Sequence, residues 1–118
     1  MLQVLKGLKK YSYAEVWNYI LASKPNTAIS VPCAFVDWDN TPRKGKRGVV
    51  VENANPVDFK KYFTKLLDKT KKEFKQDMVG VFAWNEWAEG GYLEPDERDG
   101  HDYLQAIKDS LDRFEETE

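Results

Sequence analysis

Three stretches of the chain repeat their apolar residues at helical spacing, three and four positions apart. Ser12 and Glu15 precede the first stretch and can form a capping box, in which each side chain bonds the backbone amide of the other residue. Asn55 stands before a proline at the start of the second, where an amide side chain is a favoured N-cap. The sequence therefore predicts helices over residues 13–23, 56–75 and 100–114.

Two short apolar runs separate these helices, at residues 31–37 and 78–84. Neither run alternates apolar with polar residues, which is typical of strands buried on both faces of a parallel sheet. Pro32 lacks an amide hydrogen and is therefore expected at the beginning of its strand. The order helix, strand, helix, strand, helix predicts an α/β fold with two parallel buried strands and the helices outside them.

Polar loops follow both strands, at residues 38–55 and 92–99. The first is expected to be irregular, and loops of that length inside a domain are often functional. In parallel α/β folds the loops that follow strands gather at the carboxyl edge of the sheet, where ligands bind. We therefore expect the functional side chains at this edge.

Two strands bury too little surface to form a stable parallel sheet. We therefore expect residues 1–118 to be a single partial domain, with a short amphipathic piece at 1–11 and a frayed tail at 115–118. Its open sheet edges would either pair with the missing part of a larger domain or lead to self-association.

The composition narrows the choice of partners. The net charge of −2 argues against nucleic acid, and no apolar run approaches the ~18 residues that span a membrane. Cys33 is the single cysteine, which favours a reducing compartment and hence a cytoplasmic location. His101 has no neighbouring ligand for a zinc site, and we expect neither a metal nor another cofactor.

The segment after the second strand has the strongest chemical signal. Glu86 and Glu89 are three residues apart, so both carboxyls can act on one ligand, as in glycosidases with paired carboxylates. Trp84 and Trp87 flank the pair and can stack on sugar rings, and Asn85 can donate to a sugar hydroxyl. The alternative interpretation is an exposed acidic loop beside structural tryptophans.

A second polar set follows the first strand. Asp37, Trp38, Asp39, Asn40 and Arg43 suit the binding of sugar hydroxyls, but the same segment could form a simple turn in which Arg43 pairs with Asp39. The carboxylates of both loops could also gather Ca²⁺ or Mg²⁺, although their spacing is not that of an EF-hand. Residues 43–47 form a basic cluster that fits either phosphate binding or a solvated loop.

These two segments together resemble a known family. They read Trp38-Asp39-Asn40-Thr41-Pro42-Arg43 and Trp84-Asn85-Glu86-Trp87-Ala88-Glu89-Gly90-Gly91-Tyr92-Leu93-Glu94-Pro95-Asp96. Over residues 12–114 the chain resembles the C-terminal part of the WbsX-type glycosyltransferase-like family, which is associated with bacterial O-antigen and polysaccharide synthesis. It is also similar to the family 99 glycoside hydrolases, the endo-α-mannosidases. The resemblance implies the last two strands of a (β/α)₈ TIM barrel and an oligosaccharide or polysaccharide substrate, with Tyr92 and Glu94 among its contacts.

In those hydrolases the segment reads Asn-Glu-Trp-His-Glu-Gly, and both glutamates are catalytic. The resemblance implies that Glu86 deprotonates the sugar 2-hydroxyl, which attacks C1 to give an anhydro sugar, and that Glu89 acts as general acid and then as base. Ala88 stands in place of the His, which removes a polar contact. We expect acid/base catalysis at glycosidic bonds; the alternative is a non-catalytic sugar-binding or self-associating module, the isolated segment being inactive.

Overall fold

A computed structural model describes residues 7–117, so residues 1–6 of the predicted amphipathic piece and Glu118 lie outside the described residues. Two of its strands are the predicted ones. Strand β2 (Cys33–Phe35) pairs in parallel with β4 (Gly80–Phe82). Pro32 immediately precedes β2, and its carbonyl accepts a hydrogen bond from the Gly80 N–H at 3.0 Å. Both strands are shorter than predicted, but the parallel pairing is confirmed.

The three predicted helices are present as α2 (Tyr13–Ala22), α4 (Pro56–Lys69) and α5 (Asp102–Thr117). A π-helical turn, η2 (Thr70–Phe74), extends α4, and α5 runs three residues beyond its predicted end. The Ser12 hydroxyl accepts the Glu15 N–H at 3.1 Å, and the Glu15 carboxylate accepts the Ser12 N–H at 2.7 Å. Asn55 caps α4 by accepting the Asp58 N–H at 2.8 Å. Both predicted helix starts are therefore confirmed.

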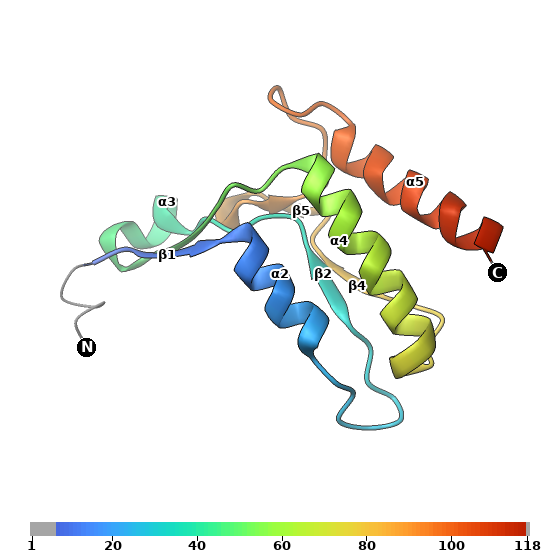
Figure 1. The fold of residues 1–118 in the computed structure, drawn as a ribbon. Coiled ribbons are helices and arrows are strands. Elements are labelled where there is room, and N and C mark those ends of the chain that lie inside the picture. The colour runs from blue at the N-terminus through green and yellow to red at the C-terminus, as the bar shows by residue number, and fades with distance from the viewer. Residues whose placement is uncertain (1–6, 118) are drawn as a thin grey trace.

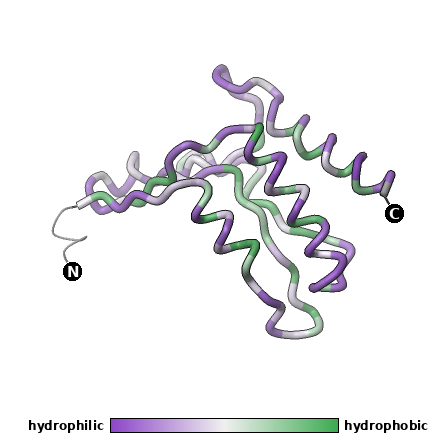
Figure 2. The backbone as a smooth tube through the Cα atoms, in the orientation of Figure 1, coloured by the Kyte–Doolittle hydropathy of each residue, from purple (hydrophilic) through white to green (hydrophobic). Residues whose placement is uncertain are grey.

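The apolar core lies between the helices and one face of the β2–β4 pair (Figures 1 and 2). Trp17 of α2 is fully buried and stacks on Tyr62 of α4, with ring centroids 5.5 Å apart. Ala34 is buried against this core, whereas Cys33 is exposed and the residues of β4 are half-buried. The predicted burial of the strands on both faces is therefore wrong, because the helices of the described chain cover only one face.

The loop predicted at residues 38–55 is not irregular. It contains a short helix α3 (Thr41–Lys44), a 3-10 turn η1 (Gly45–Arg47) and a strand β3 (Val49–Glu52). Strand β3 pairs in parallel with β1 (Lys9–Ser12), at the C-terminal end of the predicted amphipathic piece. β-branched valines favour an extended strand, but its partner lies some forty positions earlier in the sequence, so local patterning did not reveal the pair.

We call β1, α3, η1 and β3 the arm, because they project away from the three long helices (Figure 1). The radius of gyration is 15.3 Å, above the roughly 13.5 Å expected for a compact domain of this length. An apolar surface remains open beside β2, lined by Tyr11, Val16, Ile20, Phe35, Trp38, Val49, Val51 and Phe82. The described chain is thus a mixed α/β structure with an unclosed sheet, which fits a partial domain.

No helix within residues 7–117 is both long enough and apolar enough to cross a lipid bilayer.

Candidate active site

The chain turns sharply after β4 into a small antiparallel hairpin. Strands β5 (Asn85–Glu86) and β6 (Gly91–Tyr92) are joined by a 3-10 turn, η3 (Trp87–Glu89), and by Gly90. Gly90 has φ +69°, a backbone conformation that favours glycine. The Leu93 N–H donates to the Ala83 carbonyl at 2.9 Å, which ties the hairpin to the end of β4. Glu86 and Glu89 therefore lie on one short, tightly held turn.

The pairing within the hairpin determines which side chains share a face. Glu86 is opposite Gly91 and Asn85 is opposite Tyr92, and directly opposite residues of an antiparallel pair point to the same side. A β-carbon added to Gly91 would collide with the Phe82 ring. The Glu86 side chain therefore lies on the face of the hairpin that is turned toward the end of β4.

The hairpin contacts the segment that follows β2. The Asp39 N–H donates to the Glu89 carbonyl at 2.8 Å, and Arg43 Nη2 lies 3.6 Å from Glu89 Oε1. Gly90 packs so closely that a β-carbon there would lie 3.0 Å from the Asp39 nitrogen. The two polar sets predicted from the sequence are thus in direct contact.

The turn proposed as the alternative for this segment does form, but without its ion pair. The Asp39 carboxylate accepts hydrogen bonds from the Thr41 N–H at 2.9 Å and from the Thr41 hydroxyl. Arg43 is paired with Glu89 rather than with Asp39. The expectation that Arg43 would pair with Asp39 is therefore wrong, because α3 directs Arg43 toward the hairpin instead.

An aromatic platform lies on the other face of the hairpin from Glu86, the face that Tyr92 shares with Asn85. The Trp87 and Tyr92 rings stack with centroids 3.7 Å apart and an interplanar angle of 11°. The Trp87 indole N–H donates to Glu94 at 2.9 Å, and the Tyr92 hydroxyl donates to Asp96 at 2.7 Å. Burial, together with the Asp96 acceptor, raises the pKa of Tyr92 to about 12, so it remains a donor at neutral pH. Trp87 is still 48% exposed, so a sugar ring can reach this fixed indole.

The remaining predicted contacts occupy different environments. Asn40 is only 9% exposed, and its side-chain oxygen accepts the Val49 N–H at 2.6 Å, which fixes the start of β3. The Trp38 ring packs on Phe82, with centroids 5.4 Å apart, at the open apolar surface. Trp84 and Asn85 are exposed at the start of the hairpin. Asn40 thus supports the backbone of the site, whereas Trp84 and Asn85 remain accessible.

Asp37, the first aspartate of the second polar set, also lies at this edge. Burial raises the pKa of its carboxyl, while the hydrogen bond from the Trp38 N–H at 2.7 Å lowers it in part. The pKa of Tyr103 is raised mainly because Tyr103 is buried, and the charge of Asp37 raises it further. The signal in the sequence is that Asp37 is the first charged residue after an apolar strand, which marks the carboxyl edge of the sheet.

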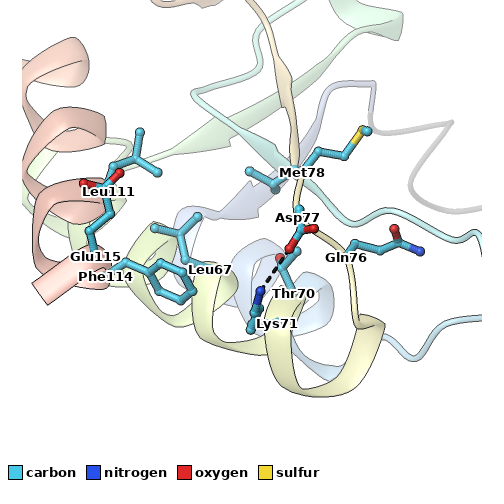
Figure 3. A pocket seen from close by; sticks show the side chains of 10 residues that line it. Leu67, Thr70, Lys71, Gln76, Asp77, Met78, Leu111, Phe114 and Glu115 are labelled. Atoms are coloured by element: carbon cyan, nitrogen blue, oxygen red, sulfur yellow. Dashed lines mark hydrogen bonds and ion pairs between the residues drawn. The ribbon is translucent and has the colours of Figure 1, made fainter. Parts of the chain in front are cut away.

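A cavity of about 270 Å³ lies at the other end of β4, beside Met78 and Val79 (Figure 3). Leu67, Leu111 and Phe114 give it an apolar wall. It is remote from the hairpin, and ligands of parallel α/β folds bind at the carboxyl ends of the strands. We therefore do not assign it to the active site. Within residues 7–117, no three His, Cys, Asp or Glu side chains cluster closely enough to hold a metal ion.

Comparisons with known proteins agree with the resemblance to the WbsX-type family. The chain is 36% identical over 78 residues to "Uncharacterized protein WxcX" of Xanthomonas campestris pv. campestris strain B100, and equally to the protein of the same name in strain ATCC 33913. These residues make up 64% of this chain and 11% of each relative. No solved structure matches the chain. Residues 2–107 match the family model described as Glycosyltransferase WbsX, and the chain therefore belongs to the WbsX glycosyltransferase family.

Proposed function

We propose that the chain is the carboxyl-terminal part of a (β/α)₈ barrel in an enzyme that acts on glycosidic bonds during polysaccharide or O-antigen synthesis or processing. Family membership supports a carbohydrate-related role. The unclosed sheet and its uncovered apolar surface support a larger parent domain, as does the small fraction of the relatives that the chain spans. The cytoplasmic location suggested by Cys33 stays a prediction.

One observation carries the catalytic part of the proposal. The contacts of Glu89 with Asp39 and Arg43 bring both polar segments to the carboxyl edge of the strand pair. Barrel enzymes take their catalytic residues from this edge and from several strands. Glu86 and Glu89 follow one strand, and Arg43 belongs to the loop that follows the other, so the arrangement has the form of part of such a site.

In the proposed reaction, Glu86 is the base and Glu89 the acid, as the resemblance to the hydrolases suggests. Glu86 takes a proton from the attacking hydroxyl, whose oxygen forms the new bond to C1. Glu89 donates its proton to the glycosidic oxygen as the old bond from C1 breaks. If the attacking group is the sugar's own 2-hydroxyl, an anhydro sugar forms, and Glu89 then acts as base for the water or acceptor that opens it.

The sugar contacts follow from the exposure of the aromatic groups. Trp87, held by Tyr92 and Glu94, offers a flat apolar surface to a sugar ring. Trp84 and Asn85 are accessible from solvent at the start of the same hairpin. We assign these residues to substrate binding, together with the carboxylate of Asp39 and the ring of Trp38, and we assign Asn40 a supporting role.

The test is Glu89→Gln in the complete natural polypeptide, with Glu97→Gln as the matched control on the loop that follows the hairpin. Loss of the acid should reduce glycoside cleavage or transfer by about 10²- to 10⁴-fold, while circular dichroism stays unchanged. Glu97 is exposed and is not part of the proposed acid–base pair, so its variant should change turnover far less than Glu89→Gln does. Unchanged turnover in Glu89→Gln would remove the catalytic assignment.

A second candidate is a non-catalytic sugar-binding or self-associating module. The exposed aromatic platform favours binding, and the open edges of the β2–β4 pair favour association. Titration of oligosaccharides followed by tryptophan fluorescence measures binding apart from turnover. A monomer in sedimentation would contradict self-association.

A further inference from the structure

The arm concentrates positive charge. It contains six basic residues and one acidic residue, Glu52. The parallel pairing of β1 with β3, and the hydrogen bond from the Lys9 N–H to the Gly48 carbonyl at 3.2 Å, bring together basic residues that are far apart in the sequence. These basic residues are Lys9, Lys10, Arg43, Lys44, Lys46 and Arg47.

Most of this charge has no acidic partner within the described part of the chain. Arg43 pairs with Glu89, and the other five basic residues make no ion pair there. By contrast, seven basic residues outside the arm pair with a carboxylate: Lys24, Lys60, Lys69, Lys71, Lys72, Arg98 and Lys108. A group of like charges without internal partners raises the local concentration of anions.

The position of the arm relates this charge to the active site. Arg43 of the arm contacts Glu89, and β3 is hydrogen-bonded to Trp38 and Asn40 beside the hairpin. Helix α3 lies at the end of the arm that is far from the three long helices (Figure 1). The loop after the hairpin, by contrast, is predominantly acidic, with Glu94, Asp96, Glu97 and Asp99 against Arg98 alone. An anionic chain that reaches Glu89 is therefore attracted by the arm and repelled by this loop.

We propose that the arm binds the carboxylates of an acidic polysaccharide, so that a chain containing uronate sugars enters the site past Arg43. This rests on the proposed function. Basic residues distributed along an extended arm match charge that repeats along a polymer better than one phosphate group. The planar guanidinium groups of Arg43 and Arg47 suit carboxylates, and the acidic loop disfavours a wide polyanion such as duplex nucleic acid.

The test compares two triple variants of the complete natural polypeptide. One is Lys44→Gln/Lys46→Gln/Arg47→Gln on the arm. The other is Lys61→Gln/Lys65→Gln/Arg113→Gln, which removes the same charges from exposed positions on α4 and α5. Calorimetry measures the binding of an oligogalacturonate and of a neutral oligosaccharide of equal length, at low and high salt.

The expected result is at least about tenfold weaker binding of oligogalacturonate by the arm variant, with little change in the control. High salt should reduce the difference, and binding of the neutral sugar should not change. Equal weakening in both triple variants would overturn the proposal, since net charge alone would explain it. Absence of oligogalacturonate binding by the wild type, or equal affinity for duplex DNA or anionic vesicles, would also overturn it.

The two proposals fail in different ways. If the arm variant binds oligogalacturonate as the wild type does while Glu89→Gln loses turnover, the acidic substrate is wrong and the catalytic assignment stands. If binding depends on the arm while Glu89→Gln turns over normally, the arm binds anions but Glu89 is not the acid.

Discussion

The two ends of the β2–β4 pair differ in how they are built. At the carboxyl end, hydrogen bonds and closely packed glycines hold the hairpin against the preceding loop, and the Glu86 and Glu89 side chains are only partly covered. At the amino end, apolar side chains of α4 and α5 surround a cavity that is bordered by the Lys71–Asp77 ion pair (Figure 3).

Under the proposed function, the chemistry takes place at the open polar end and not in the cavity at the amino end. The cavity at the amino end brings together few groups that could transfer a proton. The polar end is open, and in the proposed barrel its other walls would come from strands outside residues 7–117. We therefore expect substitutions at the amino end to change stability and those at the carboxyl end to change turnover.

The largest expected difference is in turnover, between a Glu→Gln substitution at the carboxyl end and one at the amino end. Glu86→Gln should reduce turnover in the complete polypeptide by about 10²- to 10⁴-fold, because the proposed base is lost. Glu115→Gln, at the margin of the cavity, should leave turnover unchanged. Initial rates on a glycoside substrate measure both, and equal rates in the two variants would contradict the division between the ends.

A substitution in the core should instead lower stability and leave turnover unchanged. Leu67 is 7% exposed and lines the cavity, so Leu67→Ala should lower the free energy of unfolding by about 2–4 kcal/mol without changing turnover. Leu111→Ala is the control, since Leu111 lines the same cavity but is 40% exposed. Urea unfolding measures both. A fall in turnover of the folded Leu67 variant would show that the two ends are coupled.

A glycine substitution tests the close packing at the carboxyl end. Gly91→Ala should cost about 1–3 kcal/mol, because its methyl group would collide with Phe82, and it should lower turnover by displacing the hairpin. At Gly100 a β-carbon would meet no atom within 4 Å, although φ is +56°. Gly100→Ala should therefore strain the local backbone without a collision, and turnover should not change. Comparable loss of turnover in both variants would remove the role assigned to this contact.

The smallest expected effect is a pH dependence within the carboxyl end. Burial raises the pKa of Asp37, so the charged carboxylate costs stability above the normal titration range of Asp. Asp37→Asn should therefore stabilise the protein near neutral pH, and the gain should disappear as the pH falls from the raised pKa of Asp37 to the normal titration range of Asp.

Asp96→Asn gives the contrasting case. The hydrogen bond from the Asp99 N–H, with that of Tyr92, lowers the pKa of Asp96, so its carboxylate contributes stability above the normal range that is lost as the pH falls. This variant should be less stable than the wild type near neutral pH. Unfolding midpoints measured between acid and neutral pH test both variants. If both substitutions change stability at neutral pH in the same direction, the raised pKa of Asp37 and the lowered pKa of Asp96 would be contradicted.

The sequence was sufficient to predict elements whose signals are local. Ser12 with Glu15, and Asn55 before Pro56, identified the starts of two helices because a cap depends on neighbouring residues. The β1–β3 pair was missed because its partners are distant in the sequence, although three consecutive valines after Gly48 are a typical strand signal.

The segments that meet at the hairpin were selected from the sequence, but the contacts between them were not predicted. The spacing of Glu86 and Glu89 was visible in the sequence, whereas the pairing of Arg43 with Glu89 depends on the direction of α3. The predicted burial of both faces of the strands failed because an apolar run is the same whether or not a covering layer is present.

The hydrogen bond from the Asp39 N–H to the Glu89 carbonyl also has a consequence for protein engineering. A graft of the Trp84–Asp96 segment onto another scaffold would lose the backbone donor that orients its second glutamate, along with the surface on which Gly90 rests. The transferable unit is therefore the hairpin together with Trp38–Arg43, and a library that varies one segment should vary the other with it.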